Sequence, residues 1–416
     1  MTELSREWRF ALREKTLRNA VIAAFVLATL AVASGLVSAG QQRSELGELV
    51  ERVTADRKLA LSGQSDPGGS AYYSFHLTFS PPPPLAFAAE GVRSVLPWKH
   101  RIRMLALEGQ IYESDPGNLE LSAFGALDYA FVVATLLPLL LLIMLHDLWA
   151  SERRAGRLEL LLATSPSGDG VLFRRAAVRG AMICAAVLLP FVLGAAWSGA
   201  AMASTGLIAL VVLGHALVWM LISTLVARRV KAGPTVLATL LGVWLVSIVA
   251  VPAVGKLVAE RSVEVPAGGE LLLLQRETVN DAWDLSKSET MDAFVAANPQ
   301  WAPYVQVSRP FEWKWYYAFQ WLGDARSAAM SAQLRDGVAK RDSVMGIVAL
   351  FSPTLLTERL VTRVAGTDIH SYLAYEQCVR DFHASLQSFF YPLLFEAEAF
   401  SDSAMAGLPN YEPCTE

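Results

Sequence analysis

Five apolar runs, each about 20 residues long, constrain the fold of this chain more than any other feature of its sequence. They cover residues 20–39, 124–145, 177–200, 205–227 and 234–257. A helix needs roughly 20 apolar residues to cross the hydrocarbon core of a bilayer. We therefore expect an all-α polytopic membrane protein with five transmembrane helices.

The composition agrees with a membrane protein. Hydrophobic residues make up 53% of the 416 residues and charged residues only 18%, which is too apolar for an ordinary soluble enzyme of this size. The formal net charge is -4, and the basic residues lie beside the apolar runs and form no broad patch. We therefore expect no binding of nucleic acid.

Residues 1–19 precede the first apolar run and are rich in arginine. Leu4, Trp8, Leu12 and Leu17 recur at helical spacing among the basic residues, which predicts an amphipathic helix lying at the membrane surface. The run that follows is longer than the core of a usual signal peptide, so we expect it to be retained as the first span.

The distribution of Arg and Lys predicts the orientation. Basic residues gather before the first run, in the segment 146–176, and at residues 228–231, whereas residues 201–205 contain none. Short cytoplasmic loops collect Lys and Arg. We therefore expect a multi-pass protein of the bacterial inner membrane, with its N-terminus in the cytoplasm and its C-terminus in the periplasm.

Two long segments, 40–123 and 258–416, then face outward as mainly helical periplasmic domains. Charged helical stretches are expected near 270–297 and 313–341, and the aromatic residues at 313–321 would form an interfacial belt, a core or a substrate-facing platform. The apolar stretch 344–356 is too short to span and contains Ser352-Pro353. It predicts a re-entrant or interfacial helix.

Few residues are candidates for chemistry. The chain lacks the GxxxxGK[ST] phosphate loop and the HExxH and GxSxG motifs, so we expect neither an enzyme nor a metal site. Asp128 and His215 would be intramembrane polar groups of a relay, or a helix-end residue and a partner of a neighbouring carbonyl. Cys378 and Cys414 share the last segment, where a disulfide is permitted but not required.

The polar insert 146–176 and the region around Ser352-Pro353 resemble ABC-2-type permeases, the membrane subunits of ATP-binding-cassette exporters. The closest likeness is to the branch with enlarged periplasmic loops that includes gliding-motility-type permeases. The matching residues are 137–140, Asp147-Leu148, 151–153, 156–161, Ser165-Pro166, 350–353 and 365–368.

The resemblance implies that the insert is a coupling loop which docks, with the N-terminal helix, on a cytoplasmic ABC ATPase dimer. That partner would bind ATP and Mg, and this chain would bind no cofactor of its own. A second permease subunit, identical or related, would complete a pathway in the lipid. The residues implied in coupling are Glu152, Arg153, Arg154, Gly156, Leu158, Glu159, Leu160, Leu161, Ser165 and Pro166.

Alternatives to this interpretation follow from the same residues. The insert could instead lie on the inner leaflet with its arginines on lipid phosphates. The superfamily usually has a sixth span, so we expect either five spans with an outer tail or a last span that this sequence lacks. The predicted function is the permease subunit of an exporter, and the alternative is an ATPase-coupled scaffold or mechanotransmitter acting on a periplasmic partner.

Overall fold

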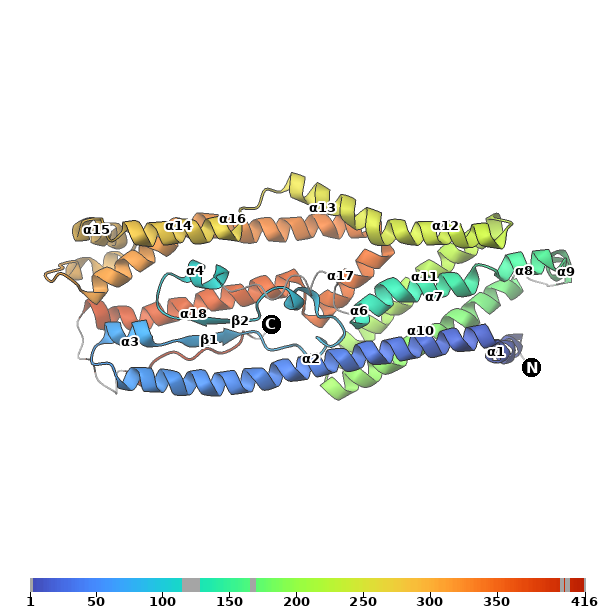
Figure 1. Cartoon of the computed structure of the whole chain (residues 1–416), viewed down its shortest axis with the longest axis horizontal. Coiled ribbons are helices and arrows are strands. Elements are labelled where there is room, and N and C mark those ends of the chain that lie inside the picture. Colours follow the sequence, from blue (N-terminus) through green and yellow to red (C-terminus); the bar gives the residue numbers. More distant parts are fainter. Residues whose placement is uncertain (1–2, 114–127, 165–169, 397–399, 401–404, 415–416) are drawn as a thin grey trace.

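The computed structural model describes residues 3–113, 128–164, 170–396, 400 and 405–414. The molecule is elongated, and its two ends differ in character (Figure 1). One end is a bundle of apolar helices. The other end, which we call the head, is built from residues 63–112, the far half of the first long helix, and residues 263–414. The two segments of the head come from opposite ends of the sequence.

Among the described residues, five helical stretches are long and apolar enough to cross a membrane, which agrees with the predicted number of spans. Residues 124–127 of the second predicted run lie outside the described residues. The spans are α2 (Lys15–Ser62), the stretch Tyr129–Arg154, α10 (Gly170–Ser198), α11 (Met202–Arg229) and the stretch Gly233–Ser262.

Two of these spans each contain one turn of π-helix. The second span consists of α6 (Tyr129–Phe131), the π turn η2 (Val132–Leu136), α7 (Leu137–Leu145) and α8 (Leu148–Arg154). The fifth span consists of α12 (Gly233–Leu245), the π turn η3 (Val246–Ala250) and α13 (Val251–Ser262). Pro138 and Pro252 come just after the π turns. Proline cannot donate a backbone hydrogen bond, so the wider turn lets the helix continue.

The first span is longer than the sequence suggests. Helix α2 has 48 residues, and at about 1.5 Å per residue it is about 72 Å long, so it passes through the bundle and runs along the head (Figure 1). The expected interfacial helix at 1–19 is shorter, because α1 (Glu3–Arg13) ends where Glu14 is extended, and α2 begins at Lys15. The span expected at 20–39 and the first residues of the segment expected to follow it belong to this one helix.

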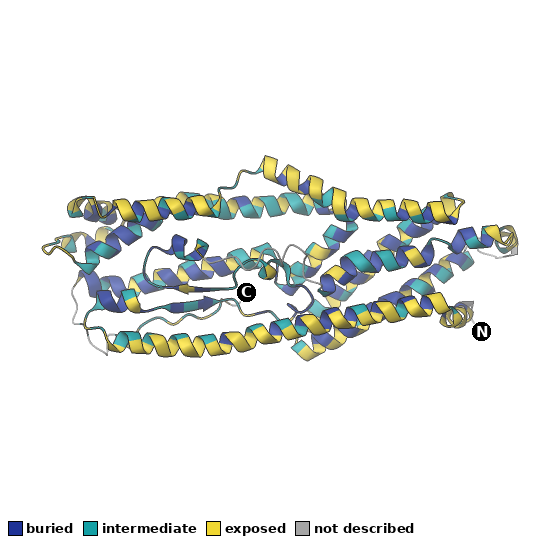
Figure 2. Cartoon of the chain, viewed as in Figure 1, coloured by how far each residue is buried: buried dark blue, intermediate teal, exposed yellow. Residues whose placement is uncertain are grey.

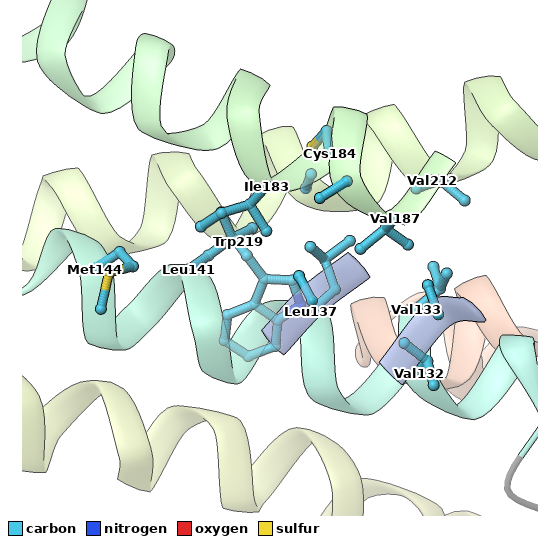
Figure 3. Packing of buried hydrophobic residues seen from close by; sticks show 14 of the residues in the cluster. Val132, Val133, Leu137, Leu141, Met144, Ile183, Cys184, Val187, Val212 and Trp219 are labelled. Carbon is cyan, nitrogen blue, oxygen red and sulfur yellow. The ribbon is translucent and has the colours of Figure 1, made fainter. Parts of the chain in front are cut away.

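Small residues on α2 allow it to pack closely against α10. Ala20, Ala24, Ala28 and Ala31 are buried along one face of α2, and close approach of this kind is typical of helices in lipid. Elsewhere in the bundle the core is filled by large side chains, and Trp219 of α11 lies beside Leu137, Leu141 and Ile183 (Figure 3). The outer faces of α10, α11 and α12 expose apolar residues (Figure 2), as expected where helices meet lipid.

The segment 85–89 forms a wedge at the junction of bundle and head. Phe87 is buried and its ring lies 6.0 Å from that of Phe191 in α10. The backbone of Phe87 touches α2 at Gly35, where an added Cβ would lie 2.0 Å from the Phe87 carbonyl oxygen. Only glycine therefore allows α2 and this wedge to meet.

The described part of the head is mostly helical, with one two-stranded sheet. Strands β1 (His76–Phe79) and β2 (Lys99–Ile102) pair antiparallel, with His76 opposite Ile102. The helices before and beside the sheet are α3 (Pro67–Tyr73), the 3-10 turn η1 (Gly91–Ser94) and α4 (Leu107–Tyr112). The later helices are α14 (Gly268–Asp281), α15 (Lys287–Ala297), the 3-10 turn η4 (Pro299–Tyr304), α16 (Trp313–Ala349), α17 (Pro353–Ala365) and α18 (Ile369–Phe395).

The two segments expected to form separate domains share one apolar core, so the prediction of two domains is wrong. Ile102 and Leu107 of the first segment pack with Phe294 and Phe319 of the second. Hydrogen bonds join them as well, because the Asp324 carboxylate accepts from the backbone N–H of Leu107 at 2.7 and 2.8 Å. Neither segment buries its apolar face alone.

The aromatic residues at 313–321 belong largely to this core. Trp315, Tyr317 and Phe319 are buried in α16, which favours the core over a belt or a platform. The Tyr317 hydroxyl donates to the carbonyl oxygen of Gly68 at 3.0 Å and so attaches α16 to α3.

Cys378 and Cys414 form a disulfide in the head. Next to it, the hydroxyl of Tyr411 donates to the carbonyl oxygen of Phe79 at 2.9 Å. The Arg57 guanidinium of α2 donates to the Asn410 side chain at 2.7 Å. These contacts fix residues 405–414 across the sheet and the far half of α2.

The prediction of one short helix over 344–356 is wrong, because residues 344–349 are the end of α16 and residues 353–356 are the start of α17. Proline after Ser352 disfavours a helical conformation at that serine, which is extended, with φ -133° and ψ 103°. The Ser352 hydroxyl instead accepts from the backbone N–H of Leu355 at 3.1 Å and caps α17.

We predict that Gly35→Ala destabilises the protein, because the new methyl group would overlap the Phe87 carbonyl oxygen. Overpacking of this kind costs about 1–3 kcal/mol. The matched control is Gly40→Ala in the same helix, where no atom lies within 4 Å of an added Cβ and alanine should raise helix stability by up to about 1 kcal/mol. Thermal unfolding in detergent measures both, and an equal response of the two variants would contradict the wedge.

We also predict that the head loses stability in acid. Burial lowers the pKa of His76 to about 3 and that of His100 and His383 to about 4. As the pH falls from about 6.5 toward 4, the unfolded chain binds protons at histidines that stay neutral in the folded head, so the free energy of unfolding decreases. The unfolding temperature measured across this range should fall.

The variant His383→Gln tests the origin of that fall. His383 Nε2 lies 2.8 Å from the Leu105 carbonyl oxygen, and a glutamine amide can donate to the same oxygen without titrating. The unfolding temperature of this variant should depend less steeply on pH than that of the wild type. An unchanged slope would rule out His383 as a contributor.

Candidate functional site

The candidate site is the polar end of the bundle, which we define as residues 3–14, 146–164 and 170–179. Here the polar insert folds into α8 (Leu148–Arg154) and α9 (Leu158–Thr164). Gly156 joins them with a positive φ of 66°, a conformation that glycine adopts without strain. Ser165 and Pro166, two of the predicted coupling residues, lie outside the described residues.

A buried carboxylate organises the polar end. Glu152 of α8 is 8% exposed and accepts from Arg157 at 2.8 Å and from Arg175 at 2.8 Å. Arg175, in the first turns of α10, also donates to Glu7 of α1 at 3.1 Å. The chain Glu7–Arg175–Glu152–Arg157 therefore joins α1, α10, α8 and the turn before α9.

Glu152 is buried and paired within the chain, and its role in coupling stays a prediction. The sequence suggested a charged residue on a docking surface, but both carboxylate oxygens of Glu152 are bonded within the chain. Ionic groups are buried only when paired, and a residue so placed holds neighbouring elements in position. Glu159, in contrast, is exposed on α9.

Further contacts made by arginines extend this arrangement to α7 and to the connection between α11 and α12. Arg179 donates to Glu14 at 2.7 Å and to the carbonyl oxygen of Met144 at 2.7 Å. Arg153 donates to the carbonyl oxygen of Lys231, between α11 and α12, at 3.1 Å. Arg154 pairs with Asp147 at 2.7 Å. The predicted residues Arg153 and Arg154 thus bond to their own chain.

Apolar side chains are exposed around this ionic centre. On α1 the buried residues Glu7 and Ala11 face inward, while Trp8, Phe10 and Leu12 are exposed. On α9 Leu160 is 63% exposed, and Leu162 is also exposed. Leu158 and Leu161 are half-buried.

A cavity of about 240 Å³ lies between α1 and α10, lined by Phe10, Glu14, Val178 and Arg179 among others. The polar end therefore presents apolar groups on a charged frame. That combination suits contact with a protein or with a membrane surface.

A second polar cluster lies inside the apolar bundle, at the two π turns. A π turn leaves backbone carbonyls without their usual helical partners. In η2 the carbonyl oxygen of Ala134 lies 3.2 Å from Nε2 of His215, and that of Thr135 accepts from Trp244 Nε1 at 3.1 Å. In η3 the carbonyl oxygen of Ser247 accepts from the Ser352 hydroxyl at 2.8 Å.

His215 has a second partner, because its Nδ1 lies 2.8 Å from the hydroxyl oxygen of Thr357 in α17. Ser247 and Ser352 also join their hydroxyl groups at 2.9 Å. Helix α17 is therefore bonded to the fourth and fifth spans by side chains from its first turns. His215 occupies the place of a structural bridge between helices, which is one of the two roles the sequence left open.

Asp128 is a helix-end residue, which is one of the two roles that the sequence left open for it. Its carboxylate accepts from the backbone N–H of Phe131 at 2.8 Å and from that of Glu90 at 3.0 Å. It caps α6 and attaches the wedge segment to the second span. Among the described residues, no direct hydrogen bond joins Asp128 and His215.

The residues that the sequence reasoning missed are Glu7, Glu14, Arg175 and Arg179. All four belong to the ionic network of the polar end. A signal was present, because Arg175 and Arg179 are four residues apart at the start of an apolar run. Arginines so near a span need acidic partners, and Glu7 and Glu14 lie in the polar segment that precedes the first span.

The fold defines a multi-pass helical membrane protein with a helical head. Residues 269–413 match a family model described as a domain of unknown function, DUF3526. The match covers nearly all of α14 and continues through α18, about a third of the chain. It includes Cys378, stops one residue before Cys414, and contains no residue of the polar end. No curated protein and no solved structure matches the chain.

We predict that Glu152→Gln loosens the polar end. The amide lacks the charge that binds Arg175 and Arg157, and a hydrogen bond to a charged group contributes about 1.5–3 kcal/mol. The unfolding temperature should therefore decrease, and protease cleavage between α8 and α10 should become faster. The control Glu159→Gln changes an exposed carboxylate on the next helix and should change stability by less than about 0.5 kcal/mol.

Proposed function

We propose that this chain is the permease subunit of an ABC-2-type exporter in the bacterial inner membrane. The polar end would face the cytoplasm, since the short connections there carry Arg153, Arg154, Arg228 and Lys231 and cytoplasmic loops are rich in basic residues. The head would then face the periplasm as one extracytoplasmic body.

The observation that carries this proposal is the rigid polar end. Glu152 and Arg175 join α1, α8 and α10, so the exposed side chains of α1 and α9 are held on one frame. A preformed apolar surface with a charged rim is what a protein interface requires. We propose that an ABC ATPase dimer binds here, with Leu160 and Phe10 as apolar anchors and Glu159 at the rim.

The same frame would transmit motion into the membrane. Arg175 lies in α10, which continues without a break to Ser198, and Glu14 immediately precedes α2. Closure of the ATPase dimer against α1 and α9 would therefore move α2 and α10 as rigid bodies. ATP and Mg would be bound by the ATPase, and this chain would supply no catalytic residue. Pairing with a second permease subunit, identical or related, would form the pathway in the lipid.

Co-purification tests the docking surface. The protein would be expressed together with its genomic neighbours, solubilised and captured through this chain, and any bound ABC ATPase would be identified. Leu160→Asp should remove most of the bound ATPase, because it places a charge in an apolar contact. The control is Leu59→Asp, which changes a leucine that is 75% exposed at the opposite end of α2. Equal capture of the ATPase by both variants would contradict docking at α9.

A second function is favoured by one observation, the continuity of α2 from the polar end to the head. Such a helix could carry ATPase-driven movement to a periplasmic partner without transport, as in a scaffold or mechanotransmitter. Cysteines placed singly on the exposed faces of α11 and α12 distinguish the two functions. Labelling by a membrane-impermeant thiol reagent during ATP turnover indicates a water-filled path and transport, whereas protection of every site indicates transmission.

A further inference from the structure

The head contains an open cavity of about 660 Å³ between β2, α4 and α14. It lies in the part of the molecule remote from the polar end (Figure 1). Small-molecule sites in proteins have volumes of roughly 300–1,000 Å³, so the cavity is large enough for a ligand. Its lining divides into a cationic side and an apolar side.

Two arginines form the cationic side. The guanidinium carbon of Arg101 lies 3.9 Å from the centre of the Phe75 ring, and that of Arg103 lies 5.0 Å from the same ring. Arg103 also stacks at 4.5 Å on Tyr72. Stacking on an aromatic face holds a guanidinium in place while its N–H groups remain able to bind an anion.

Glu113 also lines the cavity, but among the described residues its carboxylate pairs with Arg276 and not with either of these two arginines. Within the part of the chain that the structure describes, no ion pair joins Arg101 or Arg103 to a carboxylate. On the opposite rim Arg276 pairs with Glu113. Like charges beside one ring repel each other, and a bound carboxylate or phosphate would relieve that repulsion and accept bidentate hydrogen bonds.

The apolar side is formed by α14 and by the chain before α4. Leu272 and Val279 are half-buried and lie on the same face of α14, near Leu105. Helices α4 and α14 are closely packed beneath the cavity, because a Cβ on Gly109 of α4 would lie 2.1 Å from Oε1 of Gln275 in α14. The Gln275 amide is itself fixed by donating to Asp324 at 3.0 Å.

We propose that this cavity binds an anionic amphiphile, with its carboxylate or phosphate at Arg101 and Arg103 and its apolar chain along Leu272 and Val279. A fully polar anion would leave the leucine and valine side chains exposed to water, and a neutral apolar molecule would leave the arginines without a partner. The proposal does not rest on the permease function, because the site is defined by residues of the head alone.

Isothermal titration calorimetry of the full chain in nanodiscs tests the site, with the heat of empty nanodiscs subtracted. The probes are octyl phosphate and octanoate, used below their micelle concentrations, with octanol and inorganic phosphate as probes of each half of the ligand. We expect saturable binding of the charged alkyl compounds and at least tenfold weaker binding of the other two. Tighter binding of octanoate would indicate a fatty acid, and tighter binding of octyl phosphate a phospholipid derivative.

Variants assign the binding to this cavity. Arg101→Gln with Arg103→Gln should weaken binding at least tenfold, and Leu272→Glu should do so through the apolar side. The control Arg326→Gln removes an exposed arginine of α16 outside the lining residues. If the double variant does not fold, Arg101→Lys provides the test, since it keeps the charge but not the bidentate geometry. Equal binding by the control and the cavity variants, or by octanol and octanoate, would overturn the proposal.

Discussion

The buried carboxylate of Glu152 is the contact on which the arrangement of the polar end depends. It satisfies two arginines that belong to different elements, and one of these, Arg175, also binds Glu7. Breaking one member of a buried ionic group leaves the others desolvated and unpaired, which costs more than the intact group contributes. The positions of α1, α8 and α10 are therefore set together, and no one of the three helices can shift without disturbing the other two.

The same requirement, that polar groups away from water be paired, shapes the bundle at its junction with the head. Each π turn gives up regular helical hydrogen bonds, and each is compensated by side chains from other helices. The partners are His215, Trp244 and Ser352. Helix α17 is thereby bonded to the spans by hydroxyl groups and an imidazole in addition to apolar packing. The position of α17 on the bundle is specific, since a small rotation of this helix would leave several carbonyl oxygens without hydrogen-bond partners.

The number of spans was predictable because twenty consecutive apolar residues have few other uses in a protein. The break between α16 and α17 at Ser352-Pro353 also follows a local rule, although the sequence reasoning placed these residues inside one short helix. The single head was not predictable, because it depends on contacts such as Asp324 with Leu107, which are separated by more than two hundred positions. At the polar end the sequence indicated the segment but not the roles, since nothing local distinguishes the buried Glu152 from the exposed Glu159.

Helix α2 also has a mechanical consequence. A helix of 48 residues with a rise of about 1.5 Å per residue behaves as a lever about 72 Å long when it pivots at its Lys15 end. A tilt of about 5° at its Lys15 end displaces its Ser62 end by about 6 Å on that length. Because Arg57 near the far end bonds to His76 and Asn410, such a displacement would reach the sheet and the chain beyond α18. Small angles at one end of this molecule correspond to distances of several ångströms at the other.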